Sequence, residues 1–396
     1  MRSLAAAALA ALFLVACSQG TAVGPASSSR TTGRPPSPSQ APLAKLTCAG
    51  QVSASRAMAV YRPLVTPPLV EILDTSNPLK PSVACTLSPA QGARFLSGTK
   101  VAFWVGDELG TADLVSGIVT RAARLPGVAG AGAFSADGTK FAYRAFDAAG
   151  GMSTHLYVAG SDKTLYVQEP LGGHGGPGPS FGPFDQLEFS PDGSLLLDYY
   201  LFRPQSGPAS FLVFRSDGSI SFQSKMVVNG TWSPLGNSLF FFSWEQPGLT
   251  GELDKLAPDG QRQVVASGLN GVYWPRMNPD GGSIAYSASD SSVPDCGGVP
   301  HIWRLDVNTG RASQLSKTIS SAPVFVQPTV VWSDEQVLSP CGPGGPSAED
   351  GVILAHDLST GRDTKVDTAQ ILPAVSGSQL PDVRTWNLLD AWFAPA

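Results

Sequence analysis

The sequence predicts an all-β fold, a β-propeller of about seven four-stranded blades, in a chain that is exported and anchored to a membrane. Three observations lead to this prediction. A segment with a tight turn and an alternating apolar strand recurs along the chain, and an N-terminal leader ends at a cysteine. In addition, 43 Gly and 34 Pro accompany a charged fraction of only 14%, a composition typical of loop-rich β proteins.

Residues 1–16 have the layout of a signal peptide. Arg2 precedes an apolar run that ends at Ala16 and is too short to span a bilayer. The residues Leu14-Val15-Ala16-Cys17 closely resemble the lipobox of bacterial lipoproteins. The resemblance implies cleavage before Cys17 and acylation of that residue, with palmitate among the chains, and several chains make a durable anchor. The alternative is an ordinary signal peptide that contains a cysteine.

Residues 17–46 form the next segment, which is composed of Ser, Thr, Pro, Gly and Ala with no acidic residue. Such a segment buries too little apolar surface to offset its chain entropy. We therefore expect a lipidated, disordered tether that leads to a propeller over residues 47–370.

The repeat begins with apolar residues and Ser, continues through a turn with Gly or Asp-Gly, and ends in an apolar strand. Its turn glycines are 40 to 55 residues apart, the size of a propeller blade. A second hairpin with Asp-Gly or Thr-Gly at its turn follows each copy and completes four strands. The copies are Ser55–Tyr61, Phe95–Phe103, Phe134–Tyr143, Phe189–Tyr199, Trp232–Phe241, Met277–Tyr286 and Trp332–Leu338.

The element Ser-Pro-Asp-Gly at Ser190–Gly193, with its relatives, resembles the TolB-type, WD-repeat-related propeller repeat of bacterial envelope proteins. The resemblance implies a propeller fold and says little about function. Because the first and last copies are degenerate, rings of six or eight blades stay open. Residues 371–396 have no place in the repeat, and we expect this tail to pack on the propeller or close it.

The long insertions all connect second to third strands or one blade to the next, which places them on one face of the propeller. Long loops on a rigid scaffold are where binding is usually found. The acidic residues there predict an acidic binding face that includes Asp107 and Glu108. The candidate binding residues are His174, Phe181, Phe184, Trp244, Asp290, Asp295, Glu349 and Asp350.

Four cysteines follow Cys17, an even number that predicts two disulfides in an oxidising compartment. Cys296 and Cys341 fall in equivalent loops of adjacent blades, and we expect them to be bonded. Cys48 and Cys85 then pair by elimination, although they fall in an inner and an outer strand of the first blade, roughly 14 Å apart. That misfit indicates a different register for this blade, or cysteines placed in loops.

Charge and motifs limit the function. The chain has a net charge of −5, and residues 47–396 alone carry −9, so nucleic acid is a poor partner. No cofactor and no metal centre are expected, since no cysteine spacing resembles a zinc site and the chain has only four histidines. The sequence shows no nucleophile elbow, phosphate loop or zinc-protease motif.

Two classes of function remain. The first is a monomeric binding or scaffolding propeller that engages an envelope protein, peptide or glycan through the acidic loop face. The second is an extracellular propeller enzyme, a glycan lyase or hydrolase or a peptidase-like protein, with its site at the channel mouth. The innermost strands contain Glu188 as their one expected charge, which favours binding.

Overall fold

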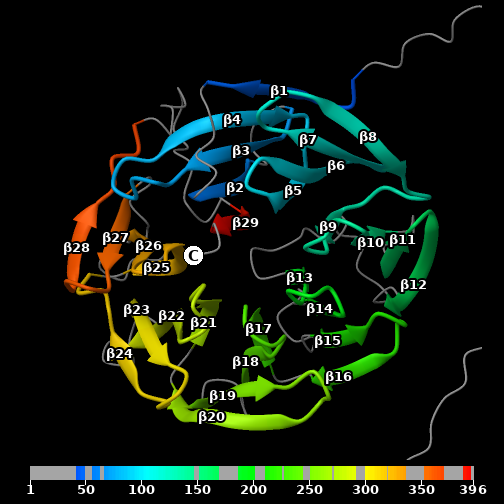
Figure 1. Ribbon diagram of the computed structural model, residues 1–396. Coiled ribbons are helices and arrows are strands. Elements are labelled where there is room, and N and C mark those ends of the chain that lie inside the picture. The colour runs from blue at the N-terminus through cyan, green and yellow to red at the C-terminus, as the bar shows by residue number, and fades with distance from the viewer. Residues whose placement is uncertain are drawn as a thin grey trace, which may run out of the picture. The chain divides into compact units, whose positions relative to one another are not determined.

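Seven antiparallel sheets stand around a common axis in the computed structural model, in the arrangement of a β-propeller (Figure 1). The structure describes residues 42–49, 56–62, 67–146, 151–168, 186–200, 210–224, 227–243, 250–269, 272–290, 299–318, 320–335, 352–369 and 387–393. All regular elements in these ranges are strands. The prediction of a seven-bladed, all-β propeller is confirmed.

Six blades are simple four-stranded meanders whose strands follow one another from the axis outward. Blade 2 consists of β5 (Gly92–Ser97), β6 (Lys100–Val105), β7 (Glu108–Asp113) and β8 (Val119–Arg124). Blade 3 consists of β9 (Ala131–Phe134), β10 (Lys140–Phe146), β11 (Met152–Val158) and β12 (Ser161–Gln168). Blade 4 consists of β13 (Gln186–Phe189), β14 (Leu195–Tyr200), β15 (Ser210–Arg215) and β16 (Ile220–Ser224). Blade 5 consists of β17 (Val227–Trp232), β18 (Leu239–Ser243), β19 (Gly251–Leu256) and β20 (Arg262–Leu269). Blade 6 consists of β21 (Val272–Met277), β22 (Ser283–Asp290), β23 (Val299–Asp306) and β24 (Ala312–Gln314). Blade 7 consists of β25 (Ser320–Gln327), β26 (Val330–Glu335), β27 (Ile353–Asp357) and β28 (Arg362–Lys365).

Blade 1 contains both ends of the folded chain. Its order from the axis outward is β29 (Asn387–Phe393), β2 (Arg56–Arg62), β3 (Leu69–Asp74), β4 (Ser82–Ser88) and β1 (Lys45–Cys48). Antiparallel pairing of β29 with β2 supplies the innermost strand from the C-terminal segment, and Figure 1 shows β29 in red beside β2. Residues 387–393, from the segment without a place in the repeat, therefore supply the missing strand of the first blade.

Strand β1 explains the misfit in the cysteine spacing. It does not take the inner position but adds a fifth strand outside β4, where Cys48 is the direct register partner of Cys85. The two Cα atoms are 4.0 Å apart and the sulfurs are bonded. This strand begins at Lys45, inside the segment expected to be tether.

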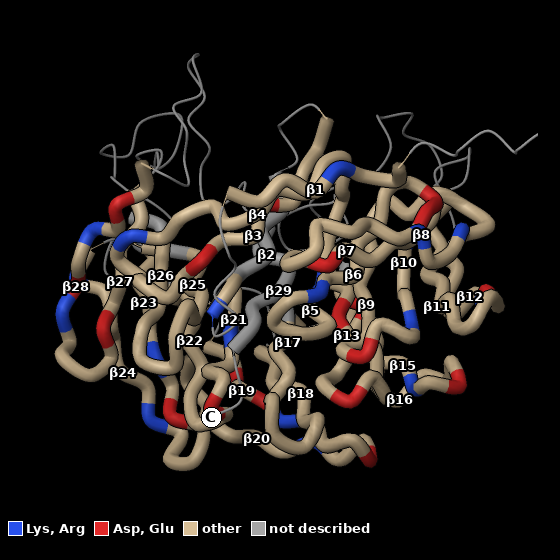
Figure 2. The backbone as a smooth tube through the Cα atoms, turned by 45° about the horizontal axis from the view of Figure 1, so that its top comes forward, with Lys and Arg blue, Asp and Glu red and all other residues tan. Residues whose placement is uncertain are grey.

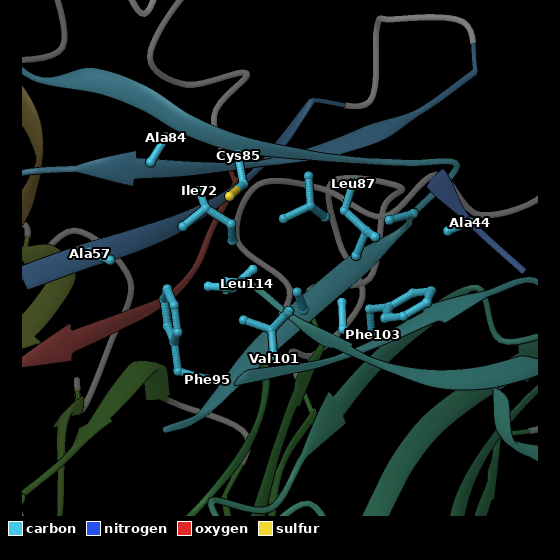
Figure 3. Packing of buried hydrophobic residues seen from close by; sticks show 14 residues of the cluster. Ala44, Ala57, Ile72, Ala84, Cys85, Leu87, Phe95, Val101, Phe103 and Leu114 are labelled. Atoms are coloured by element: carbon cyan, nitrogen blue, oxygen red, sulfur yellow. The ribbon is translucent and has the colours of Figure 1, made fainter. Parts of the chain in front are cut away.

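Apolar side chains fill the spaces between neighbouring blades, because each sheet buries both faces against the next. Between blades 1 and 2, Ile72 and Cys85 pack with Phe95, Val101 and Phe103 (Figure 3). The aromatic residue that ends several inner strands is buried in the same way, as at Phe134, Phe189 and Trp232. The aromatic residue of these repeat copies thus packs in the core between blades, consistent with its regular spacing.

The last repeat copy was aligned wrongly. Trp332 lies within the second strand β26 and pairs with Val324 of β25, whereas its counterpart Trp232 ends an inner strand. Both tryptophans are buried. Sequence similarity between two Trp-Ser pairs placed them at one level, but the pairing of β26 sets the register.

The short turns from first to second strands make hydrogen bonds within the turn and, at several junctions, to the neighbouring blade. Asp137 illustrates their chemistry: its carboxylate accepts hydrogen bonds from the Ser135 hydroxyl at 2.6 Å and the Thr139 backbone N–H at 3.0 Å. Between blades, Lys140 Nζ donates to the Gly193 carbonyl at 2.7 Å. Gln327 Nε2 of blade 7 donates to the Thr75 carbonyl of blade 1 at 3.3 Å, across the closure of the ring.

Candidate functional site

The two ends of the propeller differ in their connections. In an antiparallel meander, the links from strands 1 to 2 and 3 to 4 lie at one end, which we call the turn end. The links from strands 2 to 3 and from blade to blade lie at the other, the loop end. At the turn end, residues 135–139 and 190–194 make short turns, whereas residues 336–352 connect β26 to β27 at the loop end.

Most of the predicted binding residues lie outside the described residues. These are His174, Phe181, Phe184, Trp244, Asp295, Glu349 and Asp350. Asp290 ends β22 opposite Val299 of β23, a second and a third strand, and so belongs to the loop end. Asp290 is thus the one candidate binding residue that falls within the described residues.

Two residues of the predicted acidic face are paired with arginines. Asp107 and Glu108 stand at the turn from β6 to β7, at the loop end of blade 2. Arg124 Nε donates to Asp107 at 2.8 Å, and Arg121 donates to Glu108 at 3.1 Å. The β8 arginines therefore neutralise this part of the loop end, and charges of both signs are interspersed over the described strands (Figure 2).

The inner strands carry more charge than the sequence analysis expected. In blades 2, 4 and 6 the residue just before the repeat's aromatic or Met position is Arg94, Glu188 and Arg276. Each pairs with the corresponding small or apolar residue of its second strand, Ala102, Leu197 and Ala285. These three residues, named here the axial row, lie at equivalent levels on strands that surround the axis. The prediction of a single inner charge was wrong because β5 and β21 begin upstream of the repeat copies.

Hydrogen bonds to neighbouring blades hold two members of the axial row. Arg94 Nη1 donates to the Phe134 carbonyl of blade 3 at 3.2 Å. Glu188 accepts from Gln186 Nε2 at 2.6 Å, and the same amide spans to Gly230 of blade 5. The row thus contains side chains that are fixed in position before any ligand binds.

Arg276 occupies a distorted part of its strand. The pairing of β21 with β22 shifts register between Tyr273 and Arg276, and Trp274 has a φ of 50°. A bulky residue with positive φ is uncommon outside strained sites. Trp274 is therefore part of an irregular segment and is half-buried.

Among the residues that the structure describes, two Ser-His-Asp chains occur within single blades. In blade 7, His356 Nε2 lies 2.6 Å from Ser333 Oγ and its Nδ1 lies 2.7 Å from Asp363. In blade 3, His155 lies 2.8 Å from both Ser153 and Asp162. This is the order of groups in a nucleophilic triad. Ser333 is only 1% exposed, however, and His356 is 2% exposed, so neither is open to a substrate.

His155 lies on β11, His301 on β23 and His356 on β27, and each of these is the third strand of its blade. Both hydrogen-bonded chains connect strands of one blade. The chain in blade 7 satisfies buried polar groups, and the chain in blade 3 is half-buried. The sequence signal for them was a His followed by Asp seven residues later.

The other predicted cysteine sites lie outside the described residues. Cys17, Cys296 and Cys341 lie outside the described residues, although the strands that flank the latter two are second and third strands of blades 6 and 7. In the part of the chain that the structure describes, there is no group of three His, Cys, Asp or Glu residues arranged to hold a metal. The same residues include no helix long and apolar enough to cross a membrane.

Comparison with known proteins supports the fold. No family model matches the sequence, and no curated protein matches it. Among solved structures, an oligogalacturonate lyase in complex with manganese is 12% identical with a TM-score of 0.51, over 81% of this chain and 91% of that one. TolB from Acinetobacter baumannii is 14% identical with a TM-score of 0.43, over 87% of this chain and 68% of that one. At these identities the likeness shows the propeller fold alone.

Proposed function

We propose that this protein is an extracytoplasmic binding or scaffolding propeller, held at a membrane by lipid on Cys17, that engages an envelope protein, peptide or glycan through its loop end. One observation carries the proposal: the long connections gather at one end, while short turns bonded between blades stiffen the other. A rigid ring can present variable loops without losing its shape.

The compartment is supported independently. The disulfide between Cys48 and Cys85 is typical of proteins that mature in oxidising surroundings. The lipobox-like residues before Cys17 would place the same domain at a membrane surface, with the segment up to the first strand as its tether.

The acidic residues of the loop end give the proposal a test. We would crosslink intact envelopes that contain either the native protein or a variant with D290K, D295K, E349K and D350K, and identify what is recovered. Loss of one specific partner in the variant is the expected result.

A matched control reverses four exposed acidic residues at the turn end: D192K, D217K, D259K and D280K. This control has the same change in net charge, and thermal unfolding must show that both variants remain folded. If the control loses the partner as well, or both variants keep it, the loop end is not the binding surface.

A propeller enzyme is the second candidate, and the axial row favours it more than the sequence suggested. Arg94, Glu188 and Arg276 place three charged groups around the axis, where catalysis would need converging ionisable side chains. Screening the purified protein on polyuronates and on peptides tests this reading. Turnover that disappears in E188Q, with an unchanged melting temperature, would establish it.

A further inference from the structure

Arg276 is a cation whose hydrogen-bonding capacity is little used. Its guanidinium has five N–H donors, yet among the described residues its one hydrogen bond is a 3.4 Å contact from Nη1 to the carbonyl of Pro275, the preceding residue. By contrast, the fully buried Arg144 makes several shorter bonds to a carboxylate and two carbonyls. A half-buried arginine without such partners has donors available to a ligand.

Glu188 belongs to the same axial row as Arg276. The two residues belong to blades 6 and 4 and occupy equivalent positions on their inner strands, with the inner strand of blade 5 between them. Burial lowers the pKa of Arg276, and the negative charge of Glu188 opposes that change. An arginine guanidinium is always protonated at neutral pH, so Arg276 is a cation in the axial row beside the negative charge of Glu188.

The backbone around Arg276 is irregular on two neighbouring strands. On β21, Trp274 is left-handed within the bulge that ends at Arg276. On β25, Ala322 has a φ of 53° within a second register shift, between Ser321 and Val324. Bulges re-aim side chains and are over-represented next to functional sites. Strain of this kind persists where surrounding structure enforces it.

We infer that Arg276 binds a ligand carrying a single carboxylate at the propeller axis. A guanidinium pairs with a carboxylate through two parallel hydrogen bonds. Nearby Glu188 offsets one positive charge, so the site suits a monoanion better than a dianion such as phosphate. This site is separate from the loop-end residues tested above and does not depend on the lipid anchor.

Binding to the purified domain tests the inference by calorimetry or ligand-observed NMR. The probes are galacturonate and an N-acetylated dipeptide with a free C-terminus, with glucose and the amidated dipeptide as uncharged counterparts. Inorganic phosphate is the dianion. Whichever acid binds better identifies the source of the carboxylate, a sugar acid or a peptide end.

Three variants make the expected pattern specific. R276Q should weaken binding of the preferred acid by about tenfold or more, since the charge-assisted pair is lost, and R276K should fall between R276Q and the native protein. E188Q should strengthen binding of the acid and make binding of phosphate detectable, because it removes the negative charge that opposes an anion. R311Q, which removes an exposed turn arginine, should change nothing.

The inference is overturned if neither acid binds the native protein, or if R276Q and R311Q bind it equally well. It is also overturned if E188Q weakens binding while its melting temperature matches the native value. A failed loop-end crosslinking experiment would leave these results unaffected, so the two proposals fail separately.

Discussion

Arg144 of blade 3 and Asp198 of blade 4 form an ion pair buried between the two blades, with Nη2 and Oδ1 2.5 Å apart. Their side chains are 1% and 3% exposed. The same guanidinium donates to the carbonyls of Gln186 and Tyr199, and the Thr154 hydroxyl donates to the second carboxylate oxygen. Because these hydrogen bonds and the ion pair cross from blade 3 to blade 4, the pair fixes how the two blades pack.

Removing one partner of this pair should be strongly destabilising. D198N leaves a buried guanidinium without its counter-charge, and we expect a loss of about 3–5 kcal/mol in the free energy of unfolding. Urea unfolding measures it. The double variant R144M/D198L, which removes both charges, should recover much of the loss. Equal destabilisation of single and double variants would show that packing, not charge, is what the site supplies.

The Cys48–Cys85 bond should stabilise the fold by holding β1 on β4. The bond joins residues 37 apart in sequence, and a closed loop of that size is worth about 4 kcal/mol in the chain-entropy model, less any strain. We expect C48A/C85A to melt at a lower temperature than the native protein. Reductant should lower the melting temperature of the native protein more than that of the variant; an equal response would show that this bond contributes nothing.

Strand β29 should be required for closure of the ring. Ending the chain at residue 386 removes the inner strand of blade 1 and leaves the β2 backbone without its ladder partner. We expect aggregation or loss of cooperative unfolding, measured by size-exclusion chromatography and calorimetry. A chain that ends after Phe393 is the control and should behave like the full protein. Normal folding of the shorter chain would mean that blade 1 closes without β29.

The turn aspartates should make stability depend on pH in the acid range. Hydrogen bonds from Ser135 and Thr139 lower the pKa of Asp137, and bonds from Thr309 and Asn308 lower that of Asp306. Because these carboxyls bind protons more weakly when folded, their stabilisation is present above the unfolded pKa, about 4, and is lost as pH falls through the folded values.

Melting temperature measured between pH 2 and pH 6 tests this dependence. The native protein should lose stability steeply below about pH 4, and D137N/D306N should show a shallower slope. Parallel curves for the two proteins would assign acid sensitivity to other groups.

Ser333 should behave as a structural hydroxyl. Because it is buried with His356 in blade 7, a fluorophosphonate probe for activated serines should not label it. S333A should lower stability by about 1–3 kcal/mol, as expected when a buried hydrogen-bond partner is removed. Mass spectrometry after labelling and chemical unfolding provide the two measurements, and a labelled Ser333 peptide would reverse the assignment.

The sequence by itself determined the architecture of this protein, because its repeats are local. Ser-x-Asp-Gly turns and alternating strands specify hydrogen bonds between residues a few positions apart, and their spacing predicts the blades. The third-strand positions of His155, His301 and His356 follow from the same local pattern.

Only the tertiary structure decided which distant segments meet. Pairing of β29 with β2 joins opposite ends of the chain, and pairing of Arg144 with Asp198 joins two blades. The Cys48–Cys85 bond was predicted by elimination, but its placement on an added fifth strand came only from the structure. No local pattern encodes such partners, since each depends on how the ring closes. The axial row came into view for the same reason: equivalent positions far apart in sequence surround one axis only after the blades assemble.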